Sequence, residues 1–196
     1  MIVILFIFSQ WTSFLNSTYC YDMVSLRDIL LIGTSGGALV FNKKDTSFIA
    51  ITNLDGLLSN DVVQVGLDKY GNWWFVCRGG GITVMSQNRA MKRNFTEMDG
   101  VPSSNFSSLF IDGDIVWVGT DDNEKVWRFN MGGDPFVSSN ILPLLEVKPT
   151  NEVKKIQLIG DSVWFGTTKG IGVTHKNECD SFIVYDVGLP NDTVLA

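Results

Sequence analysis

Polar side chains recur in the turns that join the second strand to the third in each repeated unit proposed below. These turns carry a hydroxyl, a guanidinium, an ammonium and two carboxylates, from Ser35, Arg78, Lys169, Asp121 and Asp122. Such groups bind polar ligands through charge-assisted hydrogen bonds. Solvated turns carry the same residue types, so the sequence leaves two interpretations open: a ligand-binding face or an ordinary polar surface.

Catalytic chemistry has little support in the residues. Most glycoside hydrolases need two carboxylates about 5 to 10 Å apart, and the sequence shows no candidate pair. The segment from Asp68 to Trp73 resembles the Asp-containing hairpin turn of sialidase blades. That turn has a structural role, because Asp caps it and Gly supplies a positive φ. We therefore expect no catalytic residue and no enzymatic activity in this chain.

Metal binding and disulfide chemistry are also not expected. The sole histidine, His175, has no Cys or His partner at the spacing of a zinc site, so it is predicted to be a surface turn residue. The odd number of cysteines forms no complete disulfide framework, and free buried thiols are predicted for Cys20, Cys77 and Cys179. The sequence implies no metal and no cofactor.

A short turn sequence recurs along the chain, and each copy precedes the same pattern of strands. The copies are DGLLSN at Asp55 to Asn60, DGVPSSN at Asp99 to Asn105 and VGLPND at Val187 to Asp192. Repetition of this kind is typical of a fold in which no unit buries its apolar face alone, so that the units must stack. The asparagines are expected to hydrogen-bond within their own turns; these are Asn60, Asn105 and Asn191.

A second marker is the triplet that closes one strand of each unit. Its middle residues lie about 43 to 47 residues apart, close to the ~40 to 50 residues of a four-stranded propeller blade; they are Gly33, Val76, Gly119 and Gly166. The predicted fold is therefore all-β, a β-propeller with about four four-stranded blades of a larger, incomplete ring. The predicted units cover about 20–52, 62–96, 106–147 and 153–186, with the start of a fifth at 193–196.

Each unit reads as short strands separated by turn signals. The fourth strand of the third unit is not placed, because the connection through residues 130–135 contains no clear copy of the turn. The predicted strands are 20–26, 29–34, 38–41 and 48–51; 62–67, 73–77, 82–85 and 92–95; 106–111, 115–120 and 126–129; and 153–159, 162–167, 171–174 and 182–185.

Large rings occupy equivalent places two residues before the middle of the closing triplet. They are Trp74, Trp117 and Trp164, and Leu31 takes their place in the first unit. A ring buried between adjacent blades contributes several kcal/mol of apolar transfer, so these four residues are predicted to be structural contacts between blades. The glycines of the triplets would let a neighbouring backbone or ring approach closely.

This order of motifs resembles the two-component regulator propeller repeat. The best match covers residues 55–85, with the Gly56 to Asn60 turn, the Asp68 to Asn72 turn, the strand from Trp74 to Cys77 and the glycines from Gly79 to Gly81. The resemblance extends over about residues 20–196. One departure is that Val and Cys replace the Gly-Thr pair at the end of the second unit's closing strand.

The composition agrees with an all-β globular chain, with 45% hydrophobic and 18% charged residues and 19 glycines. A disordered chain would be less hydrophobic and more charged. The formal net charge of −6 argues against nucleic-acid binding, which needs a basic face.

The first nine residues form an apolar run. It is too short to span a bilayer, which takes about 20 residues, but it suits the hydrophobic part of a signal peptide. The segment 1–9 is therefore predicted to direct secretion, with the blades filling residues 10–196. The run has no preceding Lys or Arg, which leaves a buried strand or a mis-assigned start codon as alternatives.

Ring closure bears on whether these residues are a whole protein. A propeller usually closes when one terminus adds a strand to the blade begun at the other, and residues 11–14 would suit the outer strand of a last blade. Because a fifth inner strand only begins at 193–196, the chain is predicted to be a fragment, and by itself prone to aggregate. A complete four-bladed ring is the alternative.

The family resemblance implies a role in sensing. Such propellers commonly form the extracytoplasmic sensor region of histidine kinases and hybrid regulators, where ligand binding biases a dimer and the signal passes to a kinase. A small molecule or glycan would be the ligand, and the membrane would be reached only through the parent protein. The alternative is a secreted or surface-attached propeller that acts as a protein or glycan interaction scaffold without a kinase.

Overall fold

The structure is a computed structural model that describes residues 19–99, 101, 103–121, 126–136, 142–147, 152–168, 170–177 and 182–185. Several sequence predictions lie outside these residues. They are the signal peptide at 1–9, the donated strand at 11–14, the start of a fifth unit at 193–196, and the placements of Asp122, Lys169, Cys179 and Asn191.

The described residues form four antiparallel sheets of four strands, and the strands pair in chain order within each sheet. Blade 1 contains β1 (Cys20–Leu26), β2 (Ile29–Thr34), β3 (Gly37–Asn42) and β4 (Phe48–Ile51). Blade 2 contains β5 (Val62–Leu67), β6 (Trp73–Cys77), β7 (Gly81–Met85) and β8 (Lys92–Phe95). Blade 3 contains β9 (Phe106–Asp112), β10 (Ile115–Thr120), β11 (Val126–Asn130) and β12 (Leu142–Val147). Blade 4 contains β13 (Val153–Ile159), β14 (Ser162–Thr167), β15 (Gly170–His175) and β16 (Phe182–Tyr185).

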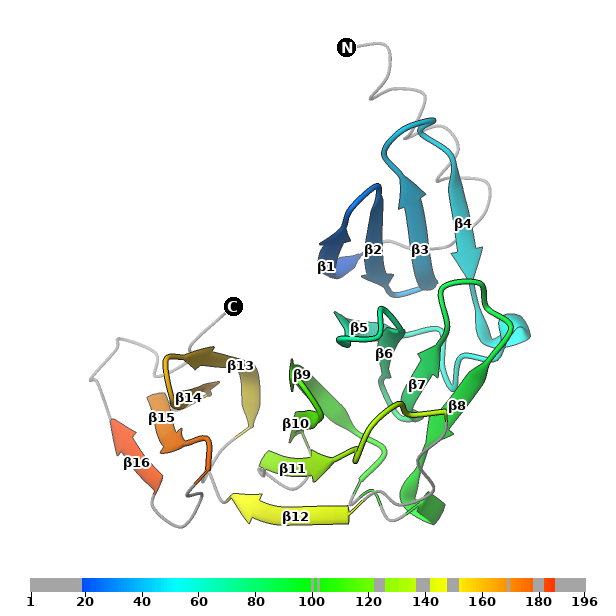
Figure 1. Cartoon of the computed structure of the whole chain (residues 1–196). Coiled ribbons are helices and arrows are strands. Elements are labelled where there is room, and N and C mark those ends of the chain that lie inside the picture. The colour runs from blue at the N-terminus through cyan, green and yellow to red at the C-terminus, as the bar shows by residue number, and fades with distance from the viewer. Residues whose placement is uncertain are drawn as a thin grey trace.

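The blades follow one another around a common axis and form an open arc (Figure 1). The first strand of each blade, β1, β5, β9 and β13, lies on the inner side of the arc, and the fourth strand lies outside. The predicted all-β architecture is confirmed, and the strand bounds differ from the predicted ones by at most one residue at either end. The unplaced strand of the third unit is β12. It carries Pro143 at the sheet edge, where a missing N–H costs least.

The recurring turn is held by a short capped helix that begins before the repeated residues. In each of the first two copies a 3₁₀ helix precedes the motif glycine, at η1 (Asn53–Asp55) and η2 (Glu97–Asp99). The Asp55 carboxylate accepts the Thr52 N–H at 2.9 Å, and the same bond joins Asp99 to Thr96 at 2.9 Å. This cap holds the turn so that the following apolar residue is buried between blades. These residues are Leu57 and Val101.

The prediction for Asn60 is wrong in its partner. Its side-chain oxygen accepts the Asn53 N–H at 2.7 Å and so braces the preceding 3₁₀ helix. The bond within the turn comes from a serine instead, because the Ser59 Oγ accepts the Asp61 N–H at 3.2 Å. The serine hydroxyl thus holds the turn, while the Asn60 amide connects the turn to the segment seven residues earlier.

The core consists of apolar clusters between adjacent blades. Leu31 is 1% exposed and lies against blade 2. Trp74 is buried between blades 2 and 3, and Trp117 between blades 3 and 4. Trp164, at the equivalent place in blade 4, is only partly buried, and its ring stacks on Tyr185 at a centroid distance of 6.5 Å. Phe165, the next residue along the strand, points to the opposite face and lies in the cluster with Trp117. Trp164 therefore points away from blade 3.

Close approach between blades depends on the closing glycines. A Cβ on Gly33 would lie 2.7 Å from the Val62 carbonyl oxygen, and one on Gly119 would lie 2.8 Å from the Val153 Cβ. Both contacts are with the first strand of the next blade. That strand can pack this closely only because the two glycines have no side chain. In blade 2 the equivalent residue is Val76, which is fully buried against blade 3.

Candidate functional site

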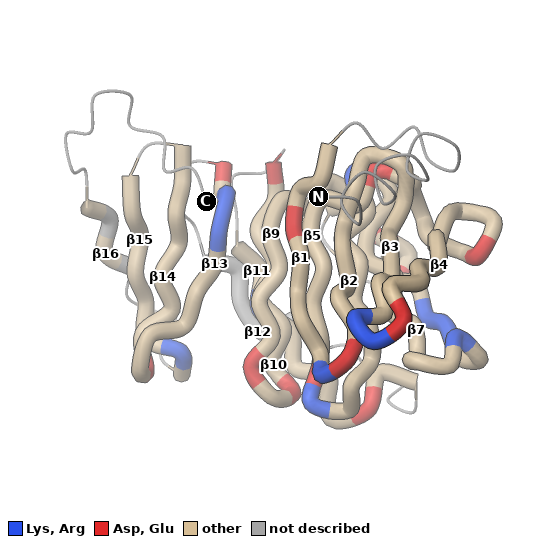
Figure 2. The backbone as a smooth tube through the Cα atoms, turned by 90° about the horizontal axis from the view of Figure 1, so that it is seen from above, with Lys and Arg blue, Asp and Glu red and all other residues tan. Residues whose placement is uncertain are grey.

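One backbone contact recurs in every blade and places the predicted ligand-face residues at one end of the strands. The residue after the second strand donates its N–H to the carbonyl of the residue before the first strand. The bonds are Ser35 to Tyr19 (3.1 Å), Arg78 to Asp61 (2.8 Å), Asp121 to Asn105 (3.0 Å) and Thr168 to Glu152 (3.0 Å). Figure 2 shows that most charged residues of the described chain lie at the two ends of the strands. We call the end formed by these eight residues the entry face.

Arg78 stands between two blades on the entry face. Its Nη1 lies 3.2 Å from the Asp61 Oδ2, and its guanidinium carbon lies 5.6 Å from the centre of the Tyr21 ring in blade 1. The side chain of Arg78 remains 48% exposed. A half-solvated guanidinium on an aromatic ring is held in place but keeps donors available for a ligand.

Asp121 and Glu152 form a carboxyl pair between blades 3 and 4. Burial and then the neighbouring Glu152 raise the pKa of Asp121 above its ordinary value. Burial would also raise the pKa of Glu152, but the Lys154 ammonium and the hydrogen bond from Asp121 outweigh it and lower that pKa. Of the two carboxyl groups, Asp121 therefore keeps its proton to the higher pH.

The structure thus joins three of the predicted residues to partners that the sequence analysis missed. Ser35, Arg78 and Asp121 share the entry face, and the positive charge of Arg78 also lowers the pKa of Glu152. Asp61 and Glu152 were missed because they precede strands rather than follow them. Their positions in the sequence could have revealed them. Each directly precedes the first strand of a unit, and in an antiparallel sheet the start of the first strand lies beside the end of the second.

A second polar set lines the inner side of the arc. The Asp22 Oδ2 accepts the Val65 N–H at 3.1 Å, and the Gln64 Oε1 accepts the Leu109 N–H at 2.5 Å. Lys155 holds the equivalent register position in β13, and its Nζ lies 4.0 Å from the Asp22 Oδ1. The first and fourth blades are therefore connected across the inner side by one ion pair.

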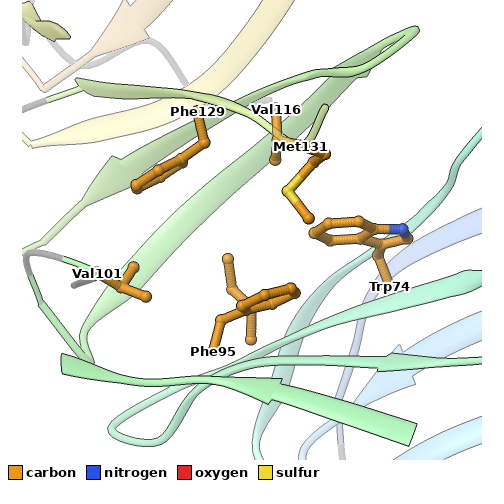
Figure 3. A pocket seen from close by; sticks show the side chains of 7 residues that line it. Trp74, Phe95, Val101, Val116, Phe129 and Met131 are labelled. Carbon is orange, nitrogen blue, oxygen red and sulfur yellow. The ribbon is translucent and has the colours of Figure 1, made fainter. Parts of the chain in front are cut away.

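The apolar space between blades 2 and 3 is not a ligand site. Figure 3 shows Trp74, Phe95, Val101, Val116, Phe129 and Met131 converging on it. The cavity has a volume of about 10 Å³, at the lower limit for one water molecule, which would also need polar partners. The indole N–H of Trp74, which lines the cavity, already donates to the Asp68 Oδ2 at 3.0 Å.

The residues considered for metal or thiol chemistry lie apart. Among the described residues no cluster of three His, Cys, Asp or Glu side chains could hold a metal ion. Cys77 is free and buried, and burial raises the pKa of its thiol. Cys20 is free but exposed, which corrects the prediction of a buried thiol: β1 is the inner edge strand, and its N-terminal end lies open to solvent. His175 ends β15, and its Nδ1 accepts the Asn177 N–H at 3.3 Å.

Solved structures establish the class of fold: the chain is an incomplete β-propeller. It resembles the extracellular domain of BT3049 from B. thetaiotaomicron, assigned as a hybrid two component system, with 20% identity over 93% of this chain and 25% of that chain and a TM-score of 0.71. The corresponding domain of BT4673 from the same organism shows 20% identity over 87% of this chain and 24% of that chain, with a TM-score of 0.67. The chain thus spans about a quarter of the length of these structures.

A third solved structure belongs to PorZ of Porphyromonas gingivalis, described as an essential bacterial surface component of the type-IX secretion system. It shares 19% identity over 86% of this chain and 26% of that chain, with a TM-score of 0.63. No protein-family model and no curated protein matches the chain. Within the described residues, no helix has the length and apolar character needed to cross a bilayer.

Proposed function

We propose that this chain is part of the extracytoplasmic sensor region of a two-component signalling protein, in which the propeller binds a ligand and the parent protein passes the signal to a kinase. The observation that carries the proposal is the entry face, where the same backbone bond in four blades presents a mixed set of polar side chains. The likeness of the fold to extracellular domains of two such systems supports it. In this proposal the chain belongs to the two-component regulator propeller repeats, and the ligand is a small molecule or a glycan.

The entry face suits binding better than glycoside hydrolysis. Asp121 and Glu152 are the carboxyl pair of this face, and each changes the pKa of the other. Most glycoside hydrolases hold their carboxylates about 5 to 10 Å apart, with the scissile bond between them. The Glu152 carboxylate is instead paired with the Lys154 ammonium, so the proposed role is recognition without turnover.

The test measures binding on purified protein. A panel of soluble small molecules and oligosaccharides is screened by thermal shift, and a ligand of the entry face should bind more weakly to Arg78→Ala than to the wild type. Arg89→Ala, which removes an exposed cation in the turn between β7 and β8 at the other end of the strands, is the matched control. A ligand that binds equally well to both variants would overturn the assignment of the entry face.

A surface scaffold without a kinase is the second candidate, favoured by the likeness to PorZ. Here the propeller would bind a protein or glycan partner at the cell surface and would transmit nothing. The coding sequence that follows residue 196 separates the two candidates. A membrane span followed by a kinase phosphoacceptor histidine motif supports the sensor, whereas further β domains followed by a stop support the scaffold.

A further inference from the structure

A groove of about 510 Å³ lies at the end of the strands opposite the entry face. One wall is the hairpin between β1 and β2, with Arg27 and Asp28. The other wall is the turn between β5 and β6, with Lys69 and Tyr70, and Gln87 from the turn after β7 completes it. Its volume lies within the ~300 to 1,000 Å³ of small-molecule sites.

The blade 2 wall of the groove is held rigidly by one carboxylate. Asp68 Oδ1 accepts the N–H groups of Tyr70 and Asn72 at 2.9 and 2.8 Å. Its Oδ2 accepts from the Asn72 Nδ2 and the Trp74 Nε1, both at 3.0 Å. With these bonds made, Asp68 is a brace within the turn. A wall formed in advance costs a ligand little ordering free energy.

Tyr70 offers a fixed aromatic surface. Its hydroxyl lies 3.5 Å from the Asp114 Oδ1 in blade 3, and the Lys69 Nζ pairs with the Asp114 Oδ2 at 2.8 Å. The residue nevertheless remains 46% exposed. The Lys69 ammonium is therefore already paired with a carboxylate. Asp28 is also paired, because its Oδ2 lies 2.6 Å from the Lys44 Nζ.

Of the two cations that line the groove, Arg27 is the one that no described residue pairs with. It is exposed, and its φ is +45°. The equivalent hairpins of blades 3 and 4 have glycine at this position, Gly113 at φ +63° and Gly160 at φ +64°. A side chain in this left-handed region costs free energy that glycine avoids. The arginine thus stands at a position where turn stability favours glycine in blades 3 and 4.

We propose that this groove binds a small carboxylate that carries a hydroxylated six-membered ring, a sugar acid. The Arg27 guanidinium pairs with the carboxylate through two parallel hydrogen bonds. The Lys69 ammonium lies 5.0 Å from the centre of the Tyr70 ring, and the ligand ring lies on the other face of Tyr70. Gln87 donates through its Nε2 to the Gly71 carbonyl at 3.0 Å, which fixes the amide and leaves its carbonyl oxygen to accept a ligand hydroxyl.

The groove and the entry face lie at opposite ends of the blades, so this proposal stands whether or not the chain is a sensor. The probe is sodium D-glucuronate, and saturation-transfer NMR measures its binding to the purified chain because this experiment needs little protein. D-glucose tests the need for the carboxylate, and benzoate tests the need for ring hydroxyls. We expect transfer from glucuronate that weakens as salt is added, and less transfer from the two comparison compounds.

Arg27→Gly removes the guanidinium and restores the residue that blades 3 and 4 carry, so this variant should fold at least as well as the wild type. We expect its affinity for glucuronate to fall at least ~10-fold, as expected for loss of a charged pair of hydrogen bonds. Tyr70→Phe should keep the affinity and Tyr70→Leu should lower it. Arg89→Gly is the matched control, since Arg89 has φ +58°, carries the same charge and does not line the groove.

Three results would overturn the proposal. The first is absence of transfer from glucuronate at millimolar concentration, and the second is equal affinity of the wild type and Arg27→Gly. The third is an equal loss in Arg89→Gly, which would show a general effect of charge. Loss of affinity in Arg78→Ala but not in Arg27→Gly would place glucuronate on the entry face instead.

Discussion

The Asp22 carboxylate in blade 1 accepts the Val65 N–H of blade 2 at 3.1 Å. β5 is the inner edge strand of its sheet, so this N–H has no strand partner on that side. Gln64 repeats the contact one blade further, toward Leu109. Side chains from one blade thus satisfy the inner edge of the next, which protects an edge that would otherwise be left open.

Removing this contact is expected to destabilise the protein. Asp22→Ala leaves the buried Val65 N–H without its acceptor, which costs about 1 to 2 kcal/mol. Urea denaturation with an unchanged slope measures the difference. Asp22→Asn keeps an acceptor oxygen and should lose much less, because the ion pair with Lys155 is long and partly exposed. Equal losses in the two variants would assign the effect to charge and contradict this account.

The Asp121 and Glu152 pair makes stability depend on pH. Because the folded pKa of Asp121 is raised, its contribution is fully present below the unfolded pKa of about 3.9 and is lost as pH rises through the folded value. Asp121→Asn keeps a donor to Glu152 and never ionises. We expect its melting temperature to exceed that of the wild type by roughly 1 to 3 °C at pH 7, with the gain vanishing near pH 4.

Replacing Glu152 should have the opposite effect on the pH dependence of stability. Its folded pKa is lowered, so its stabilisation is present above its unfolded pKa and is lost as pH falls. Glu152→Gln should therefore lower the melting temperature at pH 7, with less effect in acid. Melting curves for both variants from pH 4 to 7 test the pair; parallel curves would argue against the coupling.

Arg78→Ala should separate stability from binding. The ion pair with Asp61 is about half exposed, with side chains 48% and 32% accessible, and such pairs contribute about 0 to 1 kcal/mol. We expect the free energy of unfolding to change by less than about 1 kcal/mol while affinity for an entry-face ligand falls. A large loss of stability would instead make Arg78 a structural residue.

The closing glycines are expected to tolerate no side chain where the next blade packs. Gly119→Ala brings a Cβ against Ser108 Oγ and the Val153 Cβ, and overpacking of this kind costs about 1 to 3 kcal/mol. Gly166 holds the equivalent position in blade 4 and is only half-buried, so Gly166→Ala is the control and should lose less. Equal thermal stability of Gly119→Ala and the wild type would show that the blades can move apart.

The strands could be predicted from the sequence because two local signals coincide. Alternating apolar residues mark each strand, and the turn signals between them repeat in phase, as in the run from Val62 to Met85. The cap of the recurring turn was missed, although Thr52 and Asp55 recur as Thr96 and Asp99 three residues apart. A Thr followed three residues later by an acid is a local capping signal.

The polar contacts between blades could not be predicted in the same way. Equivalent positions carry Asp22, Gln64 and Lys155, so residue type does not repeat even where geometry does. The pair of Asp121 with Glu152 joins residues from two units whose approach depends on how blades pack. The groove likewise needs two separate turns, and the sequence does not show that Arg27 faces the turn that carries Lys69 and Tyr70.

Two tryptophans test how the two faces of blade 4 are packed. Trp117 is 1% exposed between blades 3 and 4, so Trp117→Ala should cost about 3 to 5 kcal/mol. Trp164 is partly buried on the opposite face, where it stacks on Tyr185, and Trp164→Ala should cost about 1 kcal/mol. Similar losses for the two tryptophans in urea denaturation would contradict the different burial of the two faces.

The outward face of blade 4 should also drive self-association. Trp164, Val173 and Ile183 are in register across three strands, and Ile183 is 54% exposed. An apolar sheet face of this kind favours association with another apolar surface. Ile183→Lys should therefore shift the purified chain toward monomer in sedimentation velocity across a concentration series. Leu54→Lys, at a 94% exposed turn residue, adds the same charge elsewhere and should leave association unchanged; if it acts equally, net charge rather than this face controls association.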